Sequence, residues 1–499
     1  MTAISPPEQR KAANAEVRHG AVLVVTCIAL ATVVSAMASL NVALPSLARD
    51  TGASQTQLSW VVDAYSLVFA ALLLPAGAIG DRFGRRKALL AGLLIFGAAS
   101  AIATMTTTPY LLIVLRGFLG LGASFVMPAT LSTITTTFPR QQRGRAVGTW
   151  AAVAGGSAVI GLLATGALLE EWSWRSAFVL NVGLTVVAVV GTLLVVPESA
   201  DSDAPKLDVV GSLAAVVGLA FLVYSVIEAP ENGWLDAITV AGIVAGLLVL
   251  AGFVWWELRR VNPLLDPRLF KHPRFAAGTL SISLQFFAFF GFIFVVMQYL
   301  QIARRDSALI AALSVTPMAA AMLPSARLAP RLASRIGTRP CCVGGLVLIA
   351  IGLGILARSD AATSYWLIVA GLLPLGAGMG LAMTPATTAI TDALPPALQG
   401  VASAVNDLSR EVGGALGIAV LGSVLNAGYR SHLQLTGVTP AVADKARTSI
   451  GVAAKLGGNV LQQARSAFIS GMHEALVCGS IAAVVAAIAV AVLLQRRAS

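Results

Sequence analysis

The chain has 499 residues, of which 57% are hydrophobic and 11% charged, and its mean hydropathy is +0.83. This composition is typical of a polytopic membrane protein and leaves no room for a large soluble domain. The formal net charge of +11 does not indicate nucleic-acid binding, because the basic residues lie in short loops between apolar runs, without aromatic residues among them. They indicate membrane orientation instead.

Apolar runs of about 18 to 25 residues predict fourteen transmembrane helices. We expect them near residues 19–46, 58–80, 88–106, 110–136, 145–168, 176–196, 207–228, 237–256, 275–301, 307–329, 341–357, 363–388, 398–424 and 471–494. An even number places both termini on one side of the membrane. The basic clusters fall on that side, so the positive-inside rule predicts that both termini are cytoplasmic.

An internal repeat with an offset of about 256 residues relates two parts of the chain. The segment "GLGASFVMPAT" at 120–130 matches "GAGMGLAMTPAT" at 376–387, and Pro139 and Gly144 match Pro395 and Gly400. We therefore expect an all-α membrane protein with two related six-helix bundles and a site between them. The predicted parts are a cytoplasmic tail (1–18), a first bundle (19–196), a two-helix insert (207–256), a cytoplasmic linker (257–274) and a second bundle (275–494) with a long outer loop (425–470).

The four cysteines give no sign of a metal site or a disulfide framework. Cys27 and Cys478 lie within apolar runs, and Cys341 and Cys342 are adjacent at the start of another. We expect neither a metal nor a cofactor. The four histidines form no recognisable catalytic constellation, and no phosphate-binding G-x-x-x-x-G-K-[ST] motif occurs, so an enzyme is not expected.

The segment "GAIGDRFGRRK" at 77–87 fits the signature G-x-x-x-D-R-x-G-R-R-K of the major facilitator superfamily, and the chain resembles that family. The segments "NVALPSL", "WVVDAYSL", "LRGFLGLGAS" and "REVGGALGIAVLG" are similar to its fourteen-helix drug:proton antiporter branch, closest to the quaternary-ammonium multidrug exporters. The resemblance implies a bacterial plasma-membrane exporter of lipophilic, often cationic, compounds that is driven by protons. We expect it to act as a monomer.

The signature loop has a physical rationale of its own. Its glycines allow a tight connection, and its cations suit the anionic cytoplasmic leaflet. Asp81 opposes the helix macrodipole unless a cation or another helix N-terminus meets it, so we expect it to form a latch in one conformation. The predicted conformational-switch residues are Gly77, Asp81, Arg82, Gly84, Arg85, Arg86 and Lys87.

Ionisable residues within the predicted spans are candidates for proton coupling. Asp63 in the second span lies at a depth similar to that of Arg116 in the fourth. The two could form a permanent, inert ion pair, or Asp63 could face the cavity with Arg116 behind it. In "NDLSRE", Arg410 can pair with Asp407 and leave Glu411 as a second candidate proton carrier, although a neutralised structural group is the alternative.

Aromatic, sulfur and amide side chains could line a cavity for lipophilic ligands, although packing explains many of them equally well. With Asp63, the predicted cavity residues are Trp60, Tyr65, Met127, Phe286, Phe289, Gln298, Met318 and Asn406.

Departures from the antiporter pattern leave the substrate range open. Ala36 stands where the family places an acid in the first helix, and Met322 where the closest multidrug exporters have one in the tenth. In the fifth helix Ser157 and Thr165 replace glycines and Leu162 replaces a proline. A dedicated exporter of one antibiotic, lipid or metabolite therefore remains an alternative, and a non-transporting scaffold or sensor is a second.

Overall fold

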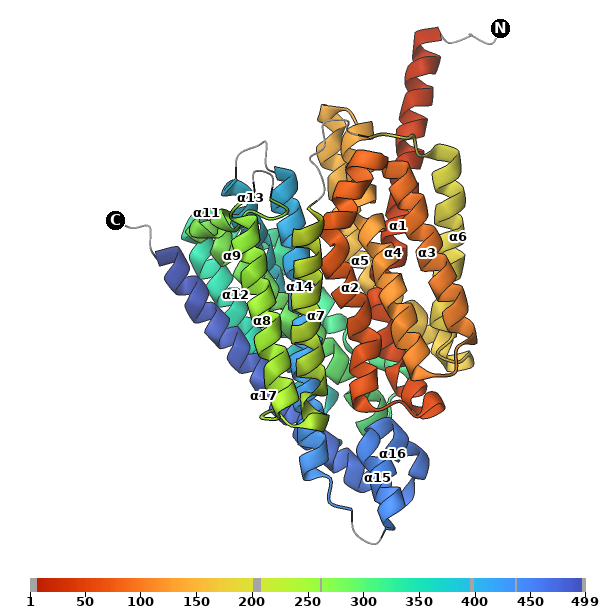
Figure 1. Ribbon diagram of the computed structural model, residues 1–499, viewed down its shortest axis with the longest axis vertical. Coiled ribbons are helices and arrows are strands. Elements are labelled where there is room, and N and C mark those ends of the chain that lie inside the picture. The colour runs from red at the N-terminus through yellow and green to blue at the C-terminus, as the bar shows by residue number, and fades with distance from the viewer. Residues whose placement is uncertain (1–6, 201–207, 261–262, 395–398, 436–437, 496–499) are drawn as a thin grey trace.

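The computed structural model describes residues 7–200, 208–260, 263–394, 399–435 and 438–495, and all regular structure in these ranges is helical. Two bundles stand side by side (Figure 1). The first contains α1 (Pro7–Thr51), α2 (Gln55–Phe83), α3 (Arg85–Met105), α4 (Pro109–Thr137), α5 (Arg140–Glu171) and α6 (Ser176–Val195). An insert follows, formed by α7 (Val209–Asn232) and α8 (Ala237–Glu257).

The second bundle begins after the short helix η1 (Pro267–Lys271). Its elements are α9 (Pro273–Gln298), the π-type turn η2 (Tyr299–Ala303), α10 (Ala308–Ser314), α11 (Thr316–Ile336), α12 (Thr338–Leu356), α13 (Tyr365–Asp392), α14 (Gln399–His432) and α17 (Gly458–Gln495). Between α14 and α17 lie α15 (Pro440–Thr448) and α16 (Ile450–Leu456), which we call the hairpin.

Thirteen helical segments of the described residues are long and apolar enough to cross a membrane, with α10 and α11 counted as one. At 32 residues α5 is also long enough, and it packs along α1. These account for the fourteen predicted spans. The split between α10 and α11 follows from Pro317, which has no backbone N–H to continue the helix.

The sequence repeat is also a structural repeat. In the first bundle, Gly120 of α4 lies against the backbone carbonyl of Tyr65 on α2, so that a Cβ would collide with it. In the second bundle, Gly376 of α13 lies in the same way against the carbonyl of Met318 on α11. Glycine allows these two helix pairs to approach to backbone contact. Of the other matched positions, Pro395 lies outside the described residues.

The two faces of the bundle differ. Both ends of the described chain lie toward one face, which we call the terminal face, and the hairpin lies on the opposite face, the hairpin face (Figure 1). From Pro7 onward the predicted N-terminal tail is helical and continuous with the first span.

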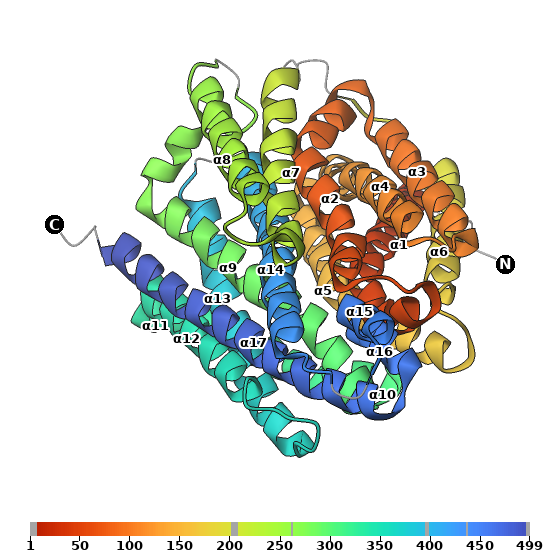
Figure 2. The same cartoon turned by 60° about the horizontal axis from the view of Figure 1, so that its bottom comes forward.

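Most of the expected outer loop at 425–470 is helical. α14 continues to His432 and α17 begins at Gly458. The hairpin is held to the first bundle, because the Ser449 hydroxyl donates to the carbonyl of Ala53 (3.0 Å), and to α14, because the Tyr429 hydroxyl donates to that of Ala446 (2.6 Å). Figure 2 shows the hairpin lying over the ends of the first-bundle helices.

Candidate functional site

Asp63 is a buried carboxylate on α2. Its side chain has no exposed surface, and neither oxygen has a hydrogen-bond partner among the described residues. The start of α2 is fixed by a capping box, in which Ser54 and Gln57 exchange side-chain-to-backbone hydrogen bonds. An ionised carboxylate at bilayer depth costs about 2.5 to 3.5 kcal/mol on insertion scales, so this position suits a group that binds a proton or gains a partner in another conformation.

Arg116 does not pair with Asp63 in this structure. Its Nε donates to the carbonyl of Val61 (2.8 Å), and its guanidinium carbon lies 4.5 Å from the centroid of the Tyr65 ring. The Tyr65 hydroxyl in turn donates to the carbonyl of Val33 on α1 (3.0 Å). Since Val61 and Tyr65 lie on the face of α2 toward α4, Asp63, two residues from each, lies on the opposite face. The alternative of a permanent ion pair is thus not realised here.

The face of α2 that carries Asp63 packs against α14 of the second bundle. Thr56 accepts a hydrogen bond from Asn426 (3.2 Å), and a Cβ on Gly422 would lie 2.9 Å from the Ser59 hydroxyl. Asp63 follows Ser59 by four residues and so continues this row. We call the contact between these two helices the α2–α14 seam. Asp63 therefore lies at the boundary between the bundles.

The polar group on α14 forms the predicted pair. Arg410 lies 3.9 Å from Asp407 (Nη1 to Oδ1), and its guanidinium carbon is 5.4 Å from the ring centroid of Phe286. The Asn406 amide oxygen accepts a hydrogen bond from Thr387 (3.1 Å). These contacts position three of the four polar side chains.

Glu411 is the fourth, and it is buried with one carboxylate oxygen, Oε2, that has no partner among the described residues. It lies on the same side of α14 as Gly422, which packs against Ser59 of α2, so it faces α2. Ser59 packs at the level of Gly422 and the two helices run antiparallel, so Asp63, one turn further along α2, lies near the level of Ala419. The distance along α14 from Ala419 to Glu411 then places the two carboxylates roughly 12 Å apart along the seam. The seam thus holds two buried carboxylates at different depths.

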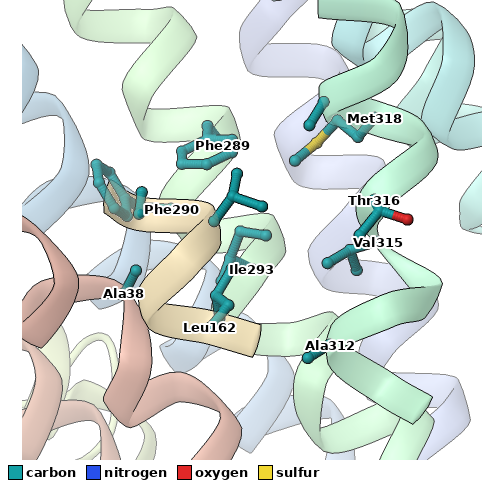
Figure 3. A pocket seen from close by; sticks show the side chains of 12 residues that line it. Ala38, Leu162, Phe289, Phe290, Ile293, Ala312, Val315, Thr316 and Met318 are labelled. Atoms are coloured by element: carbon teal, nitrogen blue, oxygen red, sulfur yellow. The ribbon is translucent and has the colours of Figure 1, made fainter. Parts of the chain in front are cut away.

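An apolar pocket lies between the two bundles (Figure 3). Its walls come from α1 and α5 of the first bundle and from α9, α10 and α11 of the second. The lining residues are Ala38, Ala158, Val159, Leu162, Phe289, Phe290, Ile293, Ala312, Val315, Thr316, Met318 and Ala319. Thr316 is the one polar side chain in this set, and its hydroxyl is bonded to the carbonyl of Leu313 (2.7 Å). The pocket suits a lipophilic group.

Two predicted cavity residues, Phe289 and Met318, line this pocket, and Phe286 packs against Phe289 and Phe290 behind it. Leu162, at the position of the family's proline, also lines it. The fifth helix thus contributes a branched side chain to the wall instead of a kink.

Other predicted cavity residues lie elsewhere. Trp60 turns toward the insert, where its indole N–H donates to Glu228 of α7 (2.9 Å). Tyr65 faces α1 and α4, and Met127 is buried in the hydrophobic core. Gln298 donates to the carbonyl of Phe294 one turn earlier (3.2 Å). Among the described residues, no three His, Cys, Asp or Glu side chains are grouped so as to hold a metal ion.

The signature loop has an internal ion pair. Asp81 at the end of α2 forms an ion pair with Arg85 at the start of α3 (2.8 Å). The cation that offsets the unfavourable interaction of Asp81 with the helix macrodipole therefore belongs to the same loop. Gly84 between them has φ = 123°, a conformation that favours glycine. Gly77 packs on Pro128 of α4, Arg82 lies over the Phe83 ring, and Lys87 is exposed.

Glu198 is a residue of this loop region that sequence reasoning missed. Its carboxylate accepts hydrogen bonds from the backbone N–H of Arg86 at the N-terminus of α3 (3.2 Å) and from that of Ser199, the next residue (3.1 Å). The Arg86 side chain also donates to the carbonyl of Leu193 on α6 (2.7 Å). Glu198 follows the sixth span, in "VVPES", on the same face as the signature loop. Because it is far from Arg86 in sequence, the contact between them could not be predicted.

The bundles touch at several points toward the hairpin face. Glu170 at the end of α5 accepts a hydrogen bond from the backbone N–H of Leu309 at the start of α10 (3.0 Å). Gln301 of η2 donates to the carbonyl of Val42 on α1 (2.8 Å). With Thr56 and Asn426 on the seam, these contacts hold the two bundles together on this side.

Two repeated helical bundles with buried carboxylates and an apolar pocket between them define a membrane transporter of the rocking-bundle type. The sequence of residues 26–418 matches the model of the Major Facilitator Superfamily. The chain belongs to this superfamily, which confirms the resemblance seen in its motifs.

Several curated relatives are similar over most of their length. The multidrug resistance protein Stp of Mycobacterium tuberculosis is 34% identical over 79% of this chain and 74% of its own. The methyl viologen resistance protein SmvA of Salmonella typhimurium is 33% identical over 86% of this chain and 89% of its own. The multidrug efflux pump LfrA of Mycolicibacterium smegmatis is 33% identical over 92% of each chain.

Solved structures share the fold. An inward-facing, unoccupied bacterial homologue of the human lysosomal transporter Spinster has a TM-score of 0.66, at 17% identity, over 97% of this chain and 99% of its own. The POT family transporter PepTSo has a TM-score of 0.65, at 15% identity, over 95% of this chain and 98% of its own.

Proposed function

We propose that the protein exports lipophilic compounds across the bacterial plasma membrane in exchange for protons. One observation carries the proposal: the α2–α14 seam holds Asp63 and Glu411, both buried and with oxygens that lack partners among the described residues, and a separate apolar pocket lies between the same two bundles. A carboxylate at such a boundary can bind a proton in one conformation and release it in the other, because its surroundings change when the bundles rock. The multidrug names of the relatives support the substrate class.

The hairpin face is the outer face in this proposal, and both termini are cytoplasmic. The basic residues of the signature loop and of the segment at 268–274 lie on the terminal face, as the positive-inside rule requires of a cytoplasmic side. Contacts such as that of Glu170 with Leu309 close the bundles at the hairpin face. The structure thus supports a state that loads its substrate from the cytoplasm.

The pocket itself supports a lipophilic body more strongly than a cation, since none of its described lining residues is charged. A positive charge on a substrate would be met by Asp63 on the seam, outside the lining set. A broad range of lipophilic compounds and one dedicated antibiotic, lipid or metabolite would both fit such walls. We propose the broad range, because the pocket offers few polar contacts to a ligand.

The test is a substrate panel on proteoliposomes with an imposed pH gradient. We expect accumulation of lipophilic compounds against their gradient, with movement of protons in the opposite direction. Asp63→Asn and Glu411→Gln should each abolish accumulation while binding of neutral lipophilic compounds persists. Asp444→Asn, a change in an exposed acid of the hairpin, is the matched control. A folded protein that moves no compound would support the scaffold or sensor alternative and overturn the proposal.

A further inference from the structure

The insert does more than extend the membrane surface, because α7 is bonded to both bundles at the hairpin face. On the first-bundle side, the Thr56 hydroxyl of α2 donates to Glu231 of α7 (2.6 Å) and the Trp60 indole N–H donates to Glu228 (2.9 Å). Both partners on α2 lie on the outer side of Asp63. Figures 1 and 2 show α7 alongside α2 and α14.

On the second-bundle side, α7 is bonded to α14 at the same level. The Ser423 hydroxyl donates to the carbonyl of Val226 (2.6 Å) in a buried contact, and Arg430 lies 3.7 Å from Glu231 (Nη1 to Oε1). The Glu231 Oε1 atom that accepts from Thr56 is therefore the one that faces Arg430. One carboxylate of the insert joins the two bundles.

Thr56 completes the connection. Its hydroxyl donates to Glu231 and accepts from the Asn426 amide, so the three side chains form a chain of hydrogen bonds from α7 through α2 to α14. Thr56 and Asn426 are both buried. A hydrogen bond to a charged group in such surroundings is stronger than one between neutral groups.

We propose that Glu231 makes α7 an outer latch, which holds the outer ends of α2 and α14 together and seals Asp63 from the outside. Opening toward the outside requires these two helix ends to move apart, because rigid bundles rock as units about the site between them. α7 cannot then remain bonded to both helices, so the contacts of Glu231 must break. The word "outer" rests on the proposed function, whereas the contacts of α7 with α2 and α14 do not depend on it.

The primary test measures the distance between the bundles. Spin labels are placed at Thr107→Cys and Ala361→Cys, two exposed positions in outer loops of the first and second bundles, after replacement of the four native cysteines. Pulsed electron paramagnetic resonance then gives the distribution of distances without substrate or pH gradient. In Glu231→Ala we expect the long-distance population to rise relative to the short one by about tenfold, as the loss of a charge-assisted hydrogen bond would give.

Two matched variants make the test specific. Glu171→Ala removes an exposed glutamate at the end of α5 and should leave the distribution unchanged. Exchange of charges, Glu231→Arg with Arg430→Glu, restores the attraction between α7 and α14 and should return a substantial part of the short-distance population. An unchanged distribution in Glu231→Ala, with the protein monodisperse, would overturn the latch.

A second measurement covers access to the seam. Ser59→Cys, in the background without native cysteines, should react slowly with a membrane-impermeant thiol reagent added from outside, and faster by about tenfold when Glu231→Ala is also present. Equal reaction rates would overturn the sealing role. Because neither measurement depends on transport, a failure of proton-coupled export and a failure of the latch give different results.

Discussion

Glu170 of the first bundle accepts a hydrogen bond from the backbone N–H of Leu309 in the second (3.0 Å). The acceptor lies at the C-terminal end of α5, and the donor lies in the first turn of α10. A carboxylate at a helix N-terminus satisfies an unpaired N–H group and is favoured by the macrodipole. This contact spans the two bundles at the face that we propose to be outside.

The first prediction concerns the pH dependence of this contact. Hydrogen bonds from the Ser307 side chain and the Leu309 backbone hold the pKa of Glu170 below its ordinary value of 4.5. The contact is therefore fully present above pH 4.5 and is lost as the pH falls through the lowered pKa. We expect the long-distance population of the Thr107 and Ala361 spin labels to grow in that acidic range. In Glu170→Gln this part of the pH dependence should be absent, and an identical pH profile in both proteins would refute the assignment.

The second prediction compares two acids of the seam region. Asp63→Asn should leave the thermal unfolding temperature unchanged or raise it, because it replaces a buried carboxylate that has no partner among the described residues with a neutral side chain. Asp407→Asn should lower that temperature, because it removes the partner of Arg410. Unfolding monitored in detergent micelles distinguishes the two. A strong loss of stability in Asp63→Asn would mean that Asp63 has a structural partner.

The third prediction concerns the close helix crossing in the second bundle. Gly376→Ala should destabilise the protein by about 1 to 3 kcal/mol, because its new Cβ would meet the backbone carbonyl of Met318. Gly344→Ala in α12 is the control, since nothing lies within 4 Å of the Cβ that it would add. Equal unfolding temperatures for the two variants would contradict the backbone contact.

The fourth prediction concerns the signature loop. Asp81→Asn removes the ion pair with Arg85, and Glu198→Gln weakens the hydrogen bond to the start of α3. We expect each change to slow turnover severalfold and to leave ligand affinity unchanged, because the pocket lies elsewhere. Initial transport rates and equilibrium binding, measured on the same preparations, separate these effects. Affinity reduced in step with the rate would place the loop at the binding site.

Most of the fold could be predicted from the sequence, since membrane spans are long apolar runs and the repeat shows in the glycines of 120–130 and 376–387. The position of the short helices at 440–456 could not, because the placement of short amphipathic helices depends on the surface that they cover. Here that surface is formed in part by the end of α1, on which Gly451 packs beside Ala48.

The sequence indicated the residue types of the candidate site and the pair of Asp407 with Arg410, but not the other pairings. The sequence predicts similar depths for Asp63 and Arg116, but depth does not determine the helix face on which each side chain lies. The face of Asp63 is determined by its neighbours Thr56 and Ser59 on the seam, and Trp60 is turned to the insert by Glu228. Glutamates far apart in sequence from their partners, such as Glu231 and Glu198, carry no local signal of their contacts.

The separation of Asp63 and Glu411 along the seam has an electrical consequence. A proton that passes between them moves roughly 12 Å along the membrane normal, which is about 0.4 of a hydrocarbon core ~30 Å thick. Since one charge that crosses the whole membrane gains about 2.3 kcal/mol per 100 mV, this step alone would gain about 0.9 kcal/mol. The membrane voltage would therefore act directly on the internal transfer, and the rate of exchange would depend on potential even at equal pH on both sides.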